Sequence, residues 1–171
     1  TYAGPEISVA STKAYMVQSA FMYVFAFRLA LARGTITEDE CRAYVKKLEE
    51  IPDLVQKCID NKEPYQLVAS KLVNETSLLY IGRGLDYALS MEGSLKLKEI
   101  SYIHSESYAA GELKHGTISL IDQGMPVVAV ATQRSLFDKM QSNVKEVKSR
   151  GALVIMICHE DTEVDMQCVD Y

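Results

Sequence analysis

The chain has 171 residues, of which 48% are hydrophobic and 24% are charged, and its formal net charge at pH 7 is -5. This size and balance fit a globular domain with its own core, and the acidic excess argues against nucleic acid or an anionic membrane surface as the main partner. The four cysteines are scattered, without a C-x-x-C pair, so they indicate neither a disulfide framework nor a zinc site. They favour a reduced, cytoplasmic setting, and no metal or cofactor is expected.

The first part of the chain predicts a long apolar helix over residues 11–33. Ser11 or Thr12 can cap its start, because hydroxyl oxygens accept hydrogen bonds from the free amides of a first turn. The length of the helix is compatible with a membrane span, but its interspersed polar residues favour a buried helix of a globular protein. We therefore expect no membrane partner.

Several shorter helices follow in the sequence. Thr37 begins one of them, and Glu40, three residues later, completes the pattern of a capping box. Residues 54–59 and 64–73 also have helical spacing. The segment up to residue 76 is therefore expected to be entirely helical.

The second half of the chain alternates strand-like and helix-like segments. Short apolar runs rich in β-branched residues occupy 78–81, 125–131 and 152–158, and residues 135–150 have helical spacing. Strands that alternate with helices are typical of a parallel α/β sheet. Because these strands are apolar at nearly every position, the sheet is expected to be covered on both faces.

Three charged residues share one side of a predicted helix after the first strand. Glu92, Lys96 and Glu99 are spaced i, i+4 and i+7, which places them in a single stripe. Charges on an apolar helix are costly unless they are paired or used, and a carboxylate beside a lysine is a candidate general base. The alternative is a solvated face with an ordinary ion pair. Apolar residues expected to bury this helix surround the stripe: Leu89, Leu95, Leu97, Ile100 and Ile103.

The three histidines differ in their surroundings. His115 lies in a loop bounded by glycines, which could bring its imidazole to a cleft, although a structural role is the alternative. His104 is expected to be a hydrogen-bonded core residue, and His159 a surface residue. The charged residues and His115 form neither a nucleophile motif nor a metal-ligand pattern.

Two other segments could contact an anion. The turn 82–84, Gly-Arg-Gly, links a strand to a helix and could offer backbone amides to a phosphate, or it could simply close a tight turn. Residues 9–13, Val-Ala-Ser-Thr-Lys, place small hydroxyls at a helix start, where they could hold a ligand or cap the helix.

Two long motifs carry a family resemblance. LKLKEISYIHSESYAAGELKHG (95–116), with the Gly-Arg-Gly turn upstream, and TYAGPEISVASTKAY (1–15) resemble segments of the isomerase half of the glutamine:fructose-6-phosphate aminotransferases. This family has two sugar-isomerase (SIS) subdomains, each a three-layer α/β sandwich with a doubly wound, flavodoxin-like parallel sheet. The resemblance implies that residues 1–33 are the tail of the first subdomain, 34–76 a helical linker, and 77–171 most of the second subdomain.

The resemblance also implies a reaction and a role for each matching residue. The family transfers ammonia to fructose 6-phosphate and isomerises the product to glucosamine 6-phosphate, a precursor of UDP-N-acetylglucosamine. Glu99 matches the base that moves a proton between C1 and C2, and His115 matches a histidine that assists ring opening in the site of a neighbouring subunit. The other matches are polar neighbours of the base and sugar contacts: Lys96, Glu92, Val9 and Ser11.

The same resemblance implies partners and leaves two alternatives open. A sugar phosphate and a second copy of the chain are the expected partners, and a glutaminase domain is expected upstream in the parent chain. The family's phosphate-binding loop and imine-forming lysine are expected outside these 171 residues, so the chain alone is expected to be inactive. The alternatives are an SIS-type deaminase or deglycase of another amino-sugar phosphate, and a non-catalytic SIS domain that binds a phosphosugar.

Overall fold

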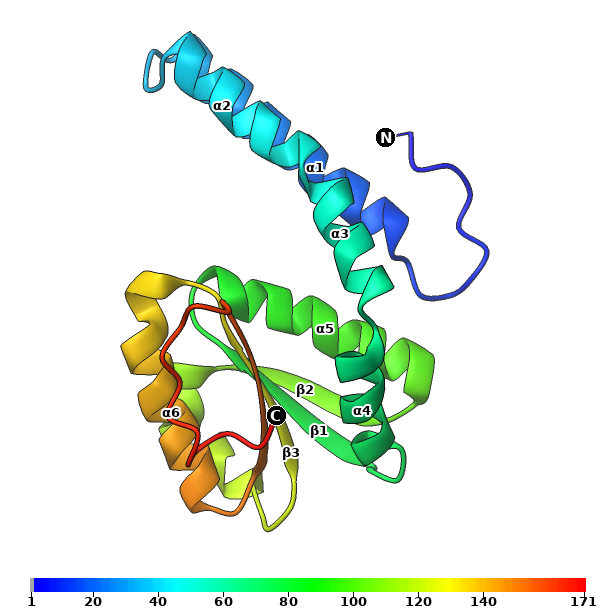
Figure 1. The fold of residues 1–171 in the computed structure, drawn as a ribbon, viewed down its shortest axis with the longest axis vertical. Helices are drawn as coiled ribbons and strands as arrows, with labels where there is room; N and C mark the ends of the chain where they lie inside the picture. The colour runs from blue at the N-terminus through cyan, green and yellow to red at the C-terminus, as the bar shows by residue number, and fades with distance from the viewer. Residues whose placement is uncertain (1) are drawn as a thin grey trace. The chain divides into compact units, whose positions relative to one another are not determined.

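The computed structural model describes residues 2–171, which fall into two units that divide after Gln66 (Figure 1). Thr1, the first residue of the predicted subdomain tail, lies outside the described residues. The helices that begin in the first unit are α1 (Lys13–Ala32), α2 (Glu38–Glu49), α3 (Ile51–Asp60) and α4 (Glu63–Leu72).

A carboxylate, rather than a hydroxyl, caps the start of α1. Glu6 Oε1 accepts a hydrogen bond from the Ala14 amide at 2.8 Å and one from Ser11 Oγ at 3.4 Å. The Thr12 hydroxyl makes no capping bond, because the Thr12 backbone already has helical angles instead of the extended ones that aim a cap side chain at the first turn. The predicted hydroxyl cap was therefore wrong, although Ser11 contributes by binding the carboxylate.

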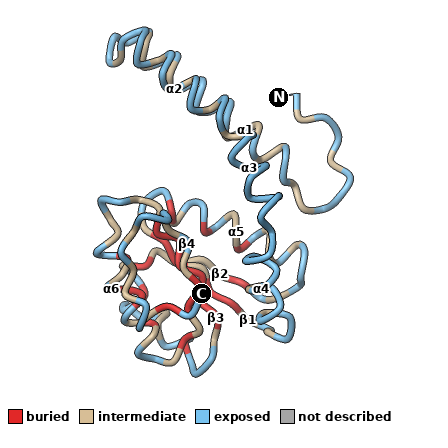
Figure 2. The backbone as a smooth tube through the Cα atoms, viewed as in Figure 1, coloured by how far each residue is buried: buried red, intermediate tan, exposed pale blue. Residues whose placement is uncertain are grey.

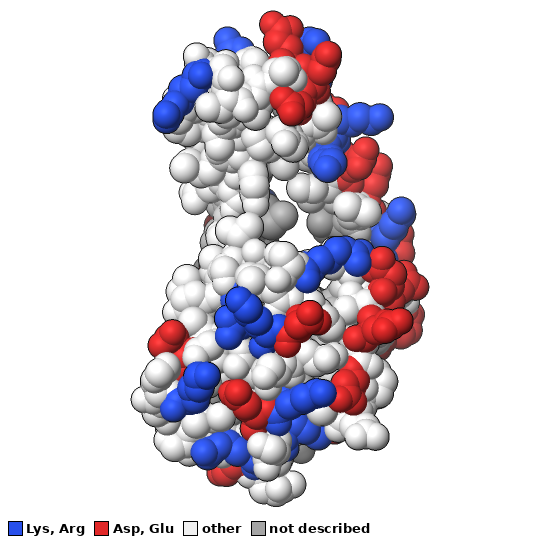
Figure 3. Space-filling view, turned by 90° about the vertical axis from the view of Figure 1, so that its left-hand side faces the viewer, with Lys and Arg blue, Asp and Glu red and all other residues white. Residues whose placement is uncertain are grey.

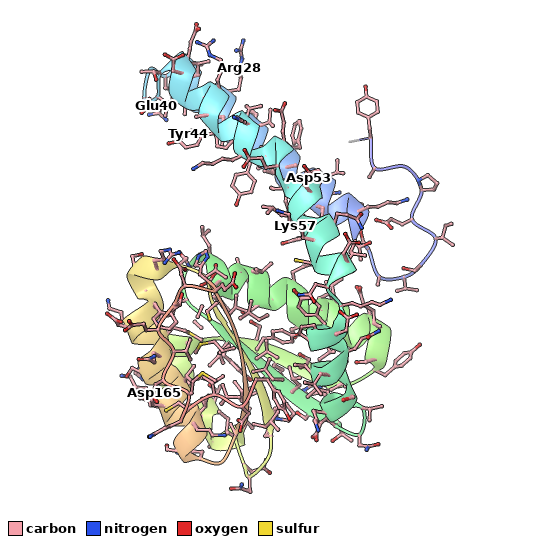
Figure 4. The ribbon with its side chains drawn as sticks, in the orientation of Figure 1. Arg28, Glu40, Tyr44, Asp53, Lys57 and Asp165 are labelled. Carbon is pink, nitrogen blue, oxygen red and sulfur yellow. The ribbon has the colours of Figure 1, made fainter. Side chains whose placement is uncertain are left out.

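Helix α1 is mostly apolar without a separate polar face, and none of its residues is buried in the structure (Figure 2). Its described contacts with α2 include Phe27 stacked on Tyr44, with ring centroids 5.2 Å apart (Tyr44 is labelled in Figure 4). Helix α1 is long and apolar enough to cross a membrane, but core helices of soluble proteins meet the same two criteria. The burial expected for this helix is thus not found within the described chain.

The start of α2 agrees with the sequence pattern. The Glu40 amide donates to Thr37 Oγ1 at 3.2 Å, and Glu40 Oε2 accepts from the Thr37 amide at 2.7 Å (Glu40 in Figure 4). This reciprocal pair is the predicted capping box, and it satisfies two amides that the helix leaves free.

The second unit contains a four-stranded parallel sheet, which confirms the predicted α/β class. Its strands, in the spatial order β2-β1-β3-β4, are β1 (Ser77–Gly82), β2 (His104–Ala109), β3 (Pro126–Ala131) and β4 (Leu153–Cys158). Strand β2 was missed because HSESYA is polar, as an edge strand can be. His104, predicted to lie in the core, begins this edge strand and is exposed.

Helices cover both faces of the sheet, so the unit has three layers (Figure 1). On one face Leu79 and Ile81 pack with α6 (Phe137–Ser149) and with Leu113 of the 3-10 helix η1 (Ala110–His115). On the other face Leu78 packs with α4 and α5 (Leu85–Ser101). Figure 2 shows the buried residues concentrated along the strands.

Helix α5 turns its small residues toward the sheet. Ser90 and Ser94 are buried, Ser94 shares a 2.9 Å hydrogen bond with Ser105 of β2, and Gly93 faces the Tyr80 ring. Small side chains let the helix approach the strands closely. Of the five apolar residues expected to bury this segment, Leu97 and Ile103 pack on the sheet. The other three, Leu89, Leu95 and Ile100, are exposed by 43 to 66%.

Adding a methyl group at Gly82 should disrupt this close contact. A Cβ there would lie 2.5 Å from the backbone carbon and oxygen of Asp86, so Gly82→Ala should cost about 3 kcal/mol in free energy of unfolding. Gly93→Ala is the control, because its Cβ meets the movable Tyr80 ring at 3.0 Å and gains about 1 kcal/mol of helix propensity. Urea unfolding of both variants tests the contrast, and equal losses would contradict it.

Candidate active site

Glu92, Lys96 and Glu99 form one ion-paired cluster on α5. Lys96 Nζ lies 2.5 Å from Glu99 Oε2 and 3.6 Å from Glu92 Oε1. Each of the three side chains is only 20 to 21% exposed. The spacing predicted from the sequence is therefore realised as a partly desolvated group of two carboxylates around one ammonium.

The cluster favours the protonated state of Lys96. The hydrogen bond to Glu99 raises the pKa of the Lys96 ammonium, with smaller contributions from the charges of Glu99 and Glu92, while desolvation opposes the shift. Lys96 therefore stays charged at neutral pH and neutralises part of the carboxylate pair. Among the described residues, Glu99 Oε1 accepts no hydrogen bond, so this oxygen is available to take a proton from a ligand.

His115 lies in a different layer from this cluster. It ends η1, which packs through Leu113 on the face of the sheet opposite α5. The imidazole is 67% exposed, and Glu112 Oε2 lies 3.8 Å from its Nε2. Within residues 2–171 the structure pairs His115 with Glu112 and with neither member of the α5 carboxylate pair. One copy of the chain thus presents Glu99 and His115 on opposite sides.

The two predicted sugar contacts belong to the first unit. Val9 is exposed in a bend before α1, and the Ser11 hydroxyl donates to Glu6. Their role as substrate contacts stays a prediction. Sequence inspection missed Glu6, whose only signal was a carboxylate several residues ahead of a helix that lacks an acidic residue in its first turn.

The Gly-Arg-Gly turn has structural roles. Gly82 allows the close approach of α5, and Gly84 has a φ of 55°, which favours glycine. Arg83 Nε donates to Asn143 Oδ1 of α6 at 3.0 Å, so the guanidinium is engaged within the protein. These contacts favour the tight-turn interpretation of this segment over that of an anion contact.

Charges of both signs are interspersed on the face of the second unit that Figure 3 shows in its lower part. One described pair there joins Lys145 Nζ of α6 to Asp165 Oδ2 at 2.9 Å (Asp165 is labelled in Figure 4). Mixed charge is not the footprint of a nucleic-acid-binding face, which requires a basic stripe.

The chain is similar to several known proteins. The SIS domain family matches residues 71–165, which is more than half of the chain. Glutamine–fructose-6-phosphate aminotransferases [isomerizing] from Caldanaerobacter subterraneus subsp. tengcongensis and Clostridium tetani are 56% identical over 155 residues and 52% identical over 160 residues. These alignments cover 91% and 94% of this chain, which spans about a quarter (26%) of each relative.

Comparison with solved structures also finds a fructose-6-phosphate aminotransferase domain. The C-terminal domain of glucosamine-fructose-6-phosphate aminotransferase from Francisella tularensis superposes with a TM-score of 0.91 at 37% identity, over 99% of this chain and 49% of that one. A phosphosugar isomerase from Silicibacter pomeroyi superposes with a TM-score of 0.72 at 28% identity, over 95% and 46%. The sequence resemblance to the aminotransferases is thereby confirmed.

Replacing Lys96 should expose the electrostatic role of the cluster. Lys96→Met leaves two carboxylates facing each other and should lower the free energy of unfolding at neutral pH. Because the folded pKa of Lys96 is raised above its unfolded value, its contribution is fully present below about pH 10.4 and is lost as the pH rises through the folded pKa.

Urea unfolding of wild type and Lys96→Met across this pH range measures the effect. Lys98→Met is the matched control, because Lys98 is exposed on the same helix and forms no ion pair in the described part of the chain. The electrostatic role of Lys96 would be contradicted if the loss of free energy of unfolding in Lys96→Met did not depend on pH. An equal loss in Lys98→Met would also contradict it.

Proposed function

Because the chain belongs to the SIS domain family, we propose that it is part of the isomerase domain of a glutamine-dependent fructose-6-phosphate aminotransferase. The aminotransferases that share 52 to 56% of its aligned residues support this substrate and reaction. The product would be glucosamine 6-phosphate, an amino-sugar precursor, and the parent chain would carry a glutaminase domain upstream. Four free cysteines are compatible with a cytoplasmic site for this reaction.

Glu99 carries the proposal, because its geometry suits proton transfer between neighbouring carbons. Isomerisation moves a hydrogen from C1 of the bound sugar imine to C2, and one carboxylate can take the proton from the first carbon and return it to the second. Lys96 holds one oxygen of Glu99 at 2.5 Å and leaves the other oxygen free of hydrogen bonds within the described chain. Lys96 therefore orients the base, while Glu92 balances the charge of the ammonium.

The opposite placement of Glu99 and His115 supports a site shared between two copies. A histidine on the η1 face of one copy can complete the α5 face of another copy in a homodimer. The exposed apolar residues of α5 beside the cluster would then be covered, as apolar patches of this kind usually are. Val9 and Ser11 are proposed as sugar contacts, as the family resemblance implies.

The two alternative functions have weaker support. A glucosamine-6-phosphate deaminase from Thermotoga maritima superposes with a TM-score of 0.60 but at 20% identity, which indicates a shared fold alone. A domain that only binds a phosphosugar needs donors for the phosphate and has no use for a base beside the sugar carbons. The paired carboxylates on α5 therefore favour the aminotransferase.

Glu99→Gln in a full-length parent chain tests the base. The amide keeps the size of the side chain but cannot accept the proton, so formation of glucosamine 6-phosphate should fall about a thousandfold while glutamine hydrolysis continues. Glu160→Gln, at an exposed loop residue of the same unit, is the control and should leave both activities unchanged. Normal amino-sugar formation by Glu99→Gln would refute the role of Glu99.

Mixed dimers test whether the site is shared. His115→Ala and Glu99→Gln parents should each be inactive alone, because every site lacks one group. After random mixing, half of the dimers are hybrids with one intact site, so about a quarter of wild-type amino-sugar formation should return. The mixture is compared with each unmixed variant after the same dissociation and reassociation, and no recovery would contradict a shared site.

A further inference from the structure

The carboxyl edge of the sheet contains a position where parallel α/β proteins usually bind ligands. In the order β2-β1-β3-β4 the connections from β1 and β3 leave in opposite directions. The space between the ends of these two strands is a topological switch point, where phosphates and nucleotides commonly lie. Here that space is bounded by residues 82–84 after β1 and by Thr132 and Gln133 after β3.

A carboxylate of the chain already occupies the donors at this position. Asp86 Oδ2 accepts hydrogen bonds from the amides of Thr132 and Gln133 at 2.8 and 3.1 Å. Asp86 Oδ1 accepts a third bond from the Thr132 hydroxyl at 2.6 Å. Two backbone amides and a hydroxyl that converge on one anion are the donor set of a phosphate-binding loop. Asp86 is 5% exposed, so the donors are closed off from solvent.

Gln133 also contacts the turn on the other side of the crevice. Gln133 Nε2 donates to the Arg83 carbonyl at 2.6 Å, and its amide group lies 3.0 to 3.2 Å from the place of a Cβ on Gly84. Arg83 Nε donates to Asn143 of α6, and Arg134, next to Gln133, pairs with Asp161. One carbonyl of the turn and one nitrogen of its arginine are therefore engaged within the protein, while Gly84 is exposed.

We propose that Asp86 is a resident anion that fills the phosphate position at the switch point of this unit, and that the crevice binds no substrate phosphate while Asp86 is present. The proposal rests on the proposed function only for the identity of the substrate, because the filled crevice is a property of the fold. It is consistent with a phosphate-binding loop outside these 171 residues, which the family resemblance already implies. It also predicts that removing the carboxylate creates a phosphate site.

Phosphate titration followed by amide NMR tests the proposal on the 171-residue chain. In wild type, neither inorganic phosphate nor glucosamine 6-phosphate should produce a saturable shift of the Thr132 and Gln133 amides. In Asp86→Ala, inorganic phosphate should shift both amides saturably and should raise the melting temperature. Asp122→Ala, which removes an exposed aspartate before β3, is the matched control and should behave as wild type.

A saturable shift of these two amides in wild type would overturn the proposal, as would a folded Asp86→Ala that shows none. If Asp86→Ala does not fold without phosphate, recovery of its folded spectrum by phosphate supports the proposal. Asp86→Ser is then titrated as a second variant, and an absence of phosphate binding by it counts against the proposal. These outcomes are independent of amino-sugar formation by Glu99→Gln, so the two hypotheses can fail separately.

Discussion

Close contact between α5 and the sheet determines most of what the second unit can do. The contact requires Gly82 at the strand end, where a methyl group would collide with the backbone of α5. It also requires the small residues Ser90, Gly93 and Ser94 on the inner side of the helix. Because that side is occupied mostly by small groups, with Leu97 beside them, Leu89, Leu95 and Ile100 are left exposed and the charged stripe lies away from the core. The cluster around Lys96 is thus supported by a rigid element.

This arrangement separates the chemistry from the core. Glu99 lies on the outer side of one helical layer, and His115 ends a segment in the other layer, so the two groups cannot belong to one pocket of a single copy. At the carboxyl edge between β1 and β3, the protein uses its own carboxylate to satisfy the donors of the loop. In the proposed function, the active site would combine residues of two chains and would not use the crevice that this sheet topology usually provides.

The parts of the structure that follow from local rules could be predicted from the sequence. The capping box of Thr37, the apolar strand over 152–158 and the i, i+4, i+7 stripe each depend on residues close together in the chain. Strand β2 could not be predicted, because an edge strand needs no apolar pattern and its pairing with β1 is set by the rest of the sheet. The internal bonds of Asp86 likewise join residues 46 and 47 positions apart.

The orientation of α5 could not be predicted from the sequence for a different reason. A helix with leucines on most sides gives no signal for which side is inward, and the usual rule favours the larger apolar side chains. Here the tertiary fold selects the serine and glycine side, so Leu95 is exposed although its hydropathy favours burial. The role of Glu6 as a helix cap depends in the same way on how the preceding loop folds back.

The exposed apolar residues of α1 would affect how the chain behaves before another surface covers them. Phe21, Phe25 and Leu29, at i, i+4 and i+8, remain about half exposed along one line of the helix. A newly made polypeptide with such a helix offers a binding segment to chaperones that hold unfolded chains until the surface is covered.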